Sequence, residues 1–65
     1  MADILSTKEQ RIAGLVTEGL SNQQIADELN IKAGTAKNYL RAIYDKTGMD
    51  SRLELAMWWN AHNGE

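Results

Sequence analysis

The chain has 65 residues, no cysteine, and nine acidic against seven basic side chains, which gives a net charge of −2. This length allows one small domain with no separate catalytic domain, and the missing cysteines exclude a disulfide framework and a thiolate metal site. No apolar run approaches the ~20 residues needed to span a bilayer, and the lack of proline and of any persistent strand pattern predicts an all-α fold.

The first predicted helix follows a capping box, Ser6-Thr7-Lys8-Glu9, in which the serine and glutamate side chains each satisfy a free backbone N–H. Ile12, Leu15 and Val16 then recur at helical spacing. Gly19 supplies a left-handed stop. These signals predict a helix between the box and the glycine.

Two further helices follow. Ser21-Asn22-Gln23-Gln24 repeats the capping arrangement and opens a helix of about two turns, which Asn30 ends. The third helix is expected to run from about Ala33 to Thr47, with Gly48 as its stop. Its two faces differ in character. One face holds Ala36, Leu40, Ile43, Tyr44 and Thr47, and the other holds Gly34, Thr35, Lys37, Asn38 and Arg41.

Two short helical patterns around a tight break are typical of a helix-turn-helix, whose second helix enters the DNA major groove. Here that helix carries Lys37, Asn38 and Arg41 on its polar side. Arginine and lysine can donate to guanine O6 and N7, and asparagine can pair with adenine. Residues 30–46 carry a net charge of +3, against −3 for residues 1–29 and −2 for residues 47–65. A solvated helix face is the simpler interpretation, but the preceding half of the motif favours contact with DNA.

The last predicted helix opens at a third capping box, Ser51-Arg52-Leu53-Glu54, and is expected to reach about Ala61, with the end of the chain within residues 60–65 fraying. This helix is too apolar for so short a chain to bury completely. The side chains expected to pack inward are Leu55, Ala56 and Trp59. Those expected to face outward, toward a second copy, are Leu53, Met57 and Trp58.

A set of these residues falls in the order and spacing of a known family: Leu5-Ser6-Thr7-Lys8-Glu9, Glu18-Gly19-Leu20-Ser21-Asn22, Ile25-Ala26, Leu29, Gly34-Thr35, Lys37-Asn38, Ile43, Lys46 and Arg52. Over about residues 5–59 the chain resembles the LuxR/FixJ/NarL-type (GerE-like) helix-turn-helix DNA-binding domain. Each piece alone is weak, but the combination of EGLSN, IA and GTxKN at these distances is specific.

The resemblance implies a four-helix, all-α domain in which the third helix is the recognition helix and the fourth pairs two copies. It implies that Glu9 ties the helices together. The positions that match base-facing residues of the family are Lys37, Asn38 and Arg41. Those that match residues touching or lying near phosphates are Asn22, Gln23, Thr35, Lys46 and Arg52.

Some of these assignments have simpler alternatives. Free N–H groups at a helix start favour a phosphate near Asn22 and Gln23, although capping by Ser21 needs no ligand. Lys46 can reach phosphate or only complement a helix C-terminus, and Arg52 is similar. The chain also departs from the family: Ala36, Tyr39 and Thr47 stand where a valine, a polar residue and a leucine are usual. Ala36 is smaller and Thr47 is more polar than the usual residue, so we expect the recognition helix to pack less tightly against the domain.

The sequence therefore predicts a cytoplasmic, sequence-specific regulator of transcription that binds double-stranded DNA as a homodimer through the fourth helix. RNA polymerase or another regulator is a further expected partner. We expect no enzymatic activity, no cofactor, no metal and no membrane association, since the single histidine, His62, has no evident partner.

Two alternatives stay open. Region four of a sigma factor shares much of the pattern, although Gly48 and the apolar fourth helix favour the first interpretation. An acidic chain with an apolar helix is also compatible with a protein-interaction module that heterodimerises with another regulator and titrates it. No sensing domain precedes the motif in this sequence, so we expect either an excised domain or a regulator of little else.

Overall fold

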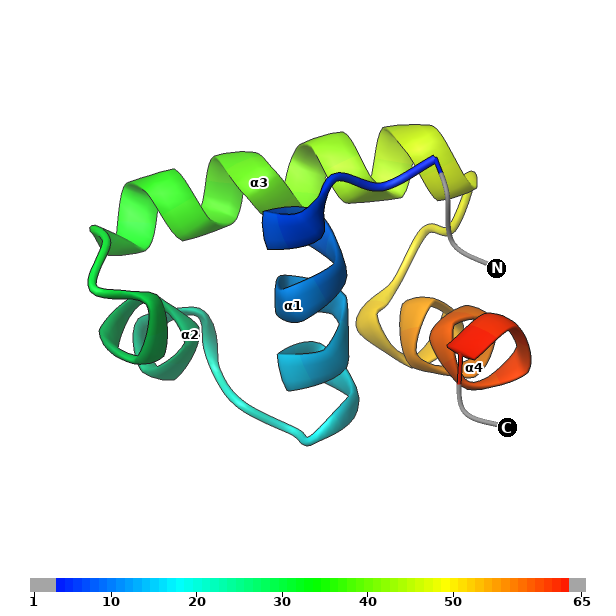
Figure 1. Ribbon diagram of the computed structural model, residues 1–65, viewed down its shortest axis with the longest axis horizontal. Helices are drawn as coiled ribbons and strands as arrows, with labels where there is room; N and C mark the ends of the chain where they lie inside the picture. Colours follow the sequence, from blue (N-terminus) through cyan, green and yellow to red (C-terminus); the bar gives the residue numbers. More distant parts are fainter. Residues whose placement is uncertain (1–3, 64–65) are drawn as a thin grey trace.

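The computed structural model describes residues 4–63 and contains four helices: α1 (Thr7–Thr17), α2 (Asn22–Leu29), α3 (Ala33–Thr47) and α4 (Arg52–Asn63). Helix α3 is the longest and lies along one side of the molecule, with α1, α2 and α4 all beneath it (Figure 1). Helix α1 lies between α2 and α4. The predicted all-α, four-helix fold is confirmed.

Local hydrogen bonds fix the ends of α1 as the sequence predicts. The Ser6 hydroxyl accepts from the Glu9 N–H at 3.2 Å, and the Ser6 N–H donates to the Glu9 carboxylate at 2.8 Å. At the other end, Gly19 has a φ of 89°, and the Leu20 N–H returns to the Leu15 carbonyl at 3.3 Å. The Gly19 N–H also donates to the Val16 carbonyl at 2.9 Å. Together these bonds form a Schellman motif, in which a left-handed glycine lets the last carbonyls of a helix be satisfied.

Capping hydrogen bonds and left-handed residues also set the ends of α2 and α3. Ser21 and Gln24 form a second complete capping box, and Asn30 ends α2 in the left-handed region at a φ of 58°. Helix α3 runs over the predicted residues and ends at Gly48, whose φ is 76°. Its start is weak, because Lys32 makes no side-chain capping hydrogen bond.

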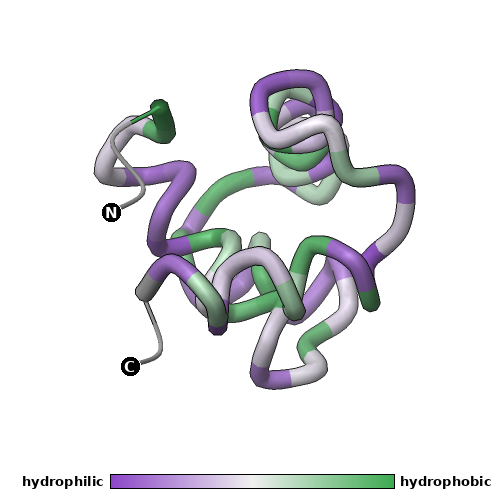
Figure 2. The backbone as a smooth tube through the Cα atoms, turned by 90° about the vertical axis from the view of Figure 1, so that its right-hand side faces the viewer, coloured by the Kyte–Doolittle hydropathy of each residue, from purple (hydrophilic) through white to green (hydrophobic). Residues whose placement is uncertain are grey.

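Each helix contributes one large, fully buried side chain to the core: Ile12, Ile25, Ile43 and Leu55, all with 0% exposure. These four side chains lie where the helices meet, and the smaller Ala13, Ala26 and Ala36 let the helix backbones approach closely. In Figure 2, hydrophobic and hydrophilic residues alternate along the helices, as expected where one face of each is buried.

Two departures from the family pattern, Ala36 and Thr47, lie on the inner face of α3. Ala36 is fully buried. The Thr47 hydroxyl donates to the Ile43 carbonyl at 2.9 Å and accepts from the Met49 N–H at 3.3 Å, so it closes the last turn of α3. The looser packing of this helix that the sequence suggested stays a prediction.

Helix α4 begins at Arg52 as predicted, but its capping and its end differ from the prediction. The Ser51 hydroxyl accepts from the Glu54 N–H at 3.2 Å, but the Glu54 carboxylate accepts from the Asp50 N–H, so the third capping box is only half formed. The helix also continues to Asn63, although the end of the chain was expected to fray; residues 64 and 65 lie outside the described part. The His62 ring supports this extra turn by stacking on Trp58 at a centroid distance of 4.3 Å.

Candidate nucleic-acid interface

Within residues 4–63, no other helix covers the outer side of α3 (Figure 1). Lys37, Asn38 and Arg41 are all exposed on this side. At ~100° per residue, Asn38 lies near the middle of the outward face, with Lys37 and Arg41 together on one flank. Sequence reasoning predicted this group, and the structure brings it together on one surface.

The cations of this surface are available to a ligand. Within residues 4–63, neither Lys37 nor Arg41 has a carboxylate within salt-bridge distance. Asp45 also lies on the outward face, four residues beyond Arg41, and it too is exposed and unpaired in the described part of the chain. The positive flank therefore has one acidic neighbour near the C-terminal end of α3.

Two residues predicted to lie near phosphates are joined at the start of α2. Arg52, from the first turn of α4, donates from Nη1 to the Asn22 side-chain oxygen at 3.0 Å and from Nη2 to the Leu20 carbonyl. The guanidinium thus ties α4 to the beginning of the helix-turn-helix. Its remaining N–H groups are on an exposed side chain. Gln23, also exposed, donates to the Asp27 carboxylate at 3.0 Å.

Lys46 has a partner that the sequence did not reveal. Its ammonium lies 2.8 Å from Glu9 Oε1, so it joins the end of α3 to the start of α1 across 37 positions of sequence. Glu9 is 5% exposed, whereas the Lys46 side chain is 44% exposed. Burial by itself raises the pKa of Glu9, but the hydrogen bonds from Lys46 and Ser6, together with the Lys46 charge, outweigh it and hold the pKa below 4.5. The structural role that the resemblance gave Glu9 agrees with this geometry.

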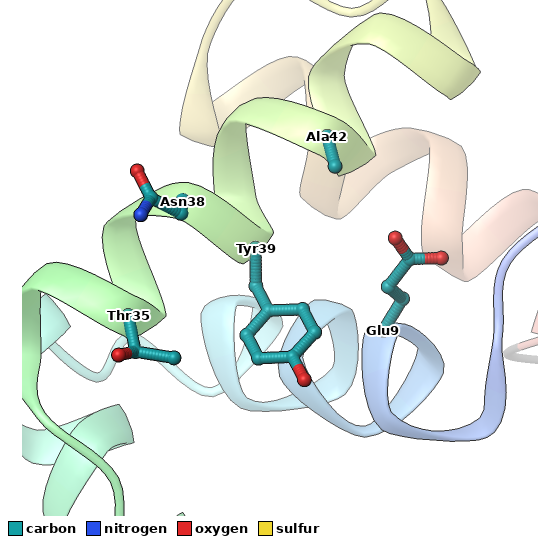
Figure 3. Close-up of a pocket in the computed structure, with 5 residues that line it drawn as sticks. All are labelled: Glu9, Thr35, Asn38, Tyr39 and Ala42. Carbon is teal, nitrogen blue, oxygen red and sulfur yellow. The ribbon is translucent and has the colours of Figure 1, made fainter.

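A hollow lies on the other flank of α3, lined by Glu9, Thr35, Asn38, Tyr39 and Ala42 (Figure 3). Four of these residues come from α3, and Glu9 comes from α1. The Tyr39 ring reaches from α3 toward the body of the domain and packs against the core. Sequence reasoning placed Thr35 and Asn38 near DNA but missed Tyr39 and Ala42. These two residues follow Thr35 by four and seven positions, a spacing that puts them on the same stripe of the helix.

The outer face of α4 is apolar, as predicted. Leu53 is 71% exposed and Met57 is 63% exposed, while Leu55 on the inner face is completely buried. Trp58 differs from the expectation that it faces outward, because its side chain is half buried against the core.

The family model for bacterial regulatory proteins of the luxR family matches residues 3–59, nearly the whole chain. The chain belongs to this family. The match confirms the resemblance found in the sequence and favours it over a sigma-factor region. The family is one of regulatory proteins and not a family of enzymes.

Similar proteins bear names of transcriptional regulators. The chain is 48% identical over 52 residues to a "Monoamine regulon transcriptional regulator" from Klebsiella aerogenes, covering 80% of this chain and 23% of that protein. It is 39% identical over 54 residues to the "DNA-binding transcriptional activator DevR/DosR" of Mycobacterium tuberculosis, with 83% and 25% covered. Against the "HTH-type transcriptional regulator MalT" of Yersinia pestis the identity is 42% over 50 residues, with 77% and 6% covered.

The chain thus spans a quarter or less of the length of these relatives. Within residues 4–63, no helix combines the length and the apolar character needed to cross a membrane.

Proposed function

We propose that this domain binds double-stranded DNA in a sequence-specific way and regulates transcription in the bacterial cytoplasm. In this proposal α3 enters the major groove, with Lys37, Asn38 and Arg41 toward the base edges. The observation that carries the proposal is the exposure of these three side chains on one face of a helix whose opposite face is anchored by fully buried residues. A rigid helix with unpaired donors is what recognition of base edges requires.

A second group of residues is proposed to hold the phosphates and so to set the register of α3. It comprises Asn22, Gln23, Thr35, Lys46 and Arg52. Arg52 and Asn22 support this role because they lie together at the exposed start of α2. Lys46 is 44% exposed even when paired with Glu9, so its ammonium keeps N–H groups for a phosphate. With so few cations, binding to random sequences should be weak, and the affinity should fall only moderately as the salt concentration rises.

Pairing through α4 is proposed to place two copies on DNA. Leu53 and Met57 leave a stripe of apolar surface exposed, with part of Trp58 beside it. A two-fold axis through this stripe would match an inverted repeat in the DNA. Met57→Glu tests the pairing: sedimentation should show loss of any dimer, and binding to an inverted repeat should weaken more than binding to a single half-site.

The decisive experiment for DNA binding compares the loss of a basic side chain on α3 with the loss of a basic side chain on α1. Duplexes are first selected from a random pool with the unaltered domain, and affinity is then measured by mobility shift at low and moderate salt. Arg41→Ala and Lys37→Ala should each reduce affinity by about tenfold or more, since a good bidentate base contact contributes ~1–3 kcal/mol. Arg11→Ala, an exposed arginine on α1, makes the same change in net charge and should have little effect.

The results separate the proposal from a protein-interaction module. Selective loss in the α3 variants, with unchanged circular dichroism, supports recognition by α3. No selected duplex, or equal losses for Arg41→Ala and Arg11→Ala, would overturn it. If Met57→Glu alone abolishes function in the cell while purified protein ignores DNA, titration of another regulator replaces this proposal. Contact with RNA polymerase or another regulator stays a prediction.

A further inference from the structure

Gly34 is a glycine that the fold does not require. Gly19 and Gly48 have positive φ values of 89° and 76°, where other residues are strained. Gly34 instead lies in the first turn of α3 with no positive φ, and nothing lies within 4 Å of the position that its Cβ would take. Glycine in the middle of a helix lowers stability by roughly 0.5–1 kcal/mol relative to alanine, and in the first turn, where Gly34 lies, the same effect is smaller. Nothing in the described part of the chain offsets this cost at Gly34.

The location of Gly34 suggests a functional reason for the glycine. It precedes Asn38 by four residues and Arg41 by seven, so the three share one stripe of α3. Gly34 is exposed, like both of these residues. A glycine on such a stripe exposes bare backbone on the surface that is proposed to face the duplex, and glycine is the residue that permits close approach of backbone to a ligand.

We propose that Gly34 is the point at which the backbone of α3 comes into van der Waals contact with DNA, and that its missing side chain sets how deeply the helix is seated. A methyl group there would hold the first turn of α3 away from the groove. The donors of Asn38 and Arg41 would then lie beyond the 2.7–3.2 Å that their hydrogen bonds need. This inference rests on the proposed DNA binding and assigns Gly34 a positioning role within it.

The chain contains a matched control for this idea. Gly14 is a second helical glycine without a positive φ, on α1 and away from the proposed interface. A Cβ at Gly14 would meet the Trp59 ring at 3.7–3.9 Å, which is ordinary contact. Gly14→Ala and Gly34→Ala should therefore both raise the melting temperature by improving helix propensity. Only the second should change binding.

The test uses a duplex selected by the unaltered domain and a duplex of unrelated sequence. Gly34→Ala should weaken binding to the selected duplex by about tenfold, the usual scale for forcing one extra methyl group into a close contact. Gly34→Leu should weaken it further. The ratio of selected to unrelated affinity should fall as well, because phosphate contacts are less sensitive to seating depth than base contacts. Gly14→Ala should bind as the unaltered domain does.

The outcomes are distinguishable. If both Gly34 variants are folded and retain the affinity and the ratio, while Arg41→Ala loses binding, the role of Gly34 is refuted and DNA recognition by α3 stands. If the unaltered domain selects no duplex, both proposals fall. If affinity drops equally for both duplexes, the glycine affects only general binding and the seating role is refuted.

Discussion

Replacing Lys46 with methionine should lower the free energy of unfolding by about 1–2 kcal/mol. A hydrogen bond to a charged group contributes about 1.5–3 kcal/mol, whereas a fully exposed ion pair contributes about 0–1 kcal/mol. The pair with Glu9 lies between these limits, because the carboxylate is buried while the lysine is 44% exposed. The Ser6 N–H still satisfies part of the carboxylate in the variant.

Such a loss is large for this domain. A chain of this size has a free energy of unfolding of roughly 3–10 kcal/mol, and each kcal/mol shifts the melting temperature by about 4–8 °C. We therefore expect Lys46→Met to melt about 5–15 °C below the unaltered protein. Lys8→Met, which removes an exposed lysine that forms no ion pair within residues 4–63, should change the free energy of unfolding by less than ~0.5 kcal/mol.

The pH dependence gives an independent check. The pKa of Glu9 is lower in the folded protein than its ordinary value of 4.5. Stabilisation by this carboxylate is therefore fully present above about pH 4.5 and is lost as the pH falls through the folded-state value. In Lys46→Met, burial is opposed only by Ser6, so the pKa of Glu9 should rise and the acid-induced loss of stability should shrink.

The assay is urea denaturation of four proteins: the unaltered domain, Lys46→Met, Glu9→Gln and the double variant, each from pH 3 to pH 7. A double-mutant cycle isolates the coupling between the two side chains. A coupling energy under about 0.3 kcal/mol, with parallel pH profiles for all four proteins, would refute the claim that this pair joins α1 to α3.

Other substitutions probe the helix ends, the core and the charge of the interface. Gly48→Ala should destabilise by roughly 1–2 kcal/mol, since its φ of 76° is left-handed, and a thermal melt that matches the unaltered protein would contradict this. Leu55→Ala should cost about 2–5 kcal/mol and nearly unfold the domain, whereas Leu53→Ala, two positions away and 71% exposed, should stay within ~0.5 kcal/mol in the same tryptophan-fluorescence titration. Asp45→Asn should strengthen DNA binding roughly two- to fivefold at low salt and less at high salt, since it removes an exposed negative charge near the proposed phosphates; an effect that does not depend on salt would argue against this placement.

Helix boundaries were determined by the sequence to a large extent, because the interactions that set them join residues three to five positions apart. Ser6 with Glu9 and Ser21 with Gln24 start two helices where predicted, and Gly48 ends α3 at the predicted residue. The exposed stripe of Lys37, Asn38 and Arg41 follows from helical periodicity in the same way. None of these features depends on how the helices pack.

Only the tertiary structure decided which distant side chains meet. The pair of Glu9 with Lys46 joins α1 to α3 across 37 positions, and the bridge from Arg52 to Asn22 joins α4 to α2 across 30 positions. Both exist because of where the packed helices place these side chains. The partial burial of Trp58 likewise depends on how α4 packs against the core. Local sequence fixes each helix and its apolar stripe, but the contacts between helices depend on how four stripes pack around one core, and that is a property of the whole chain.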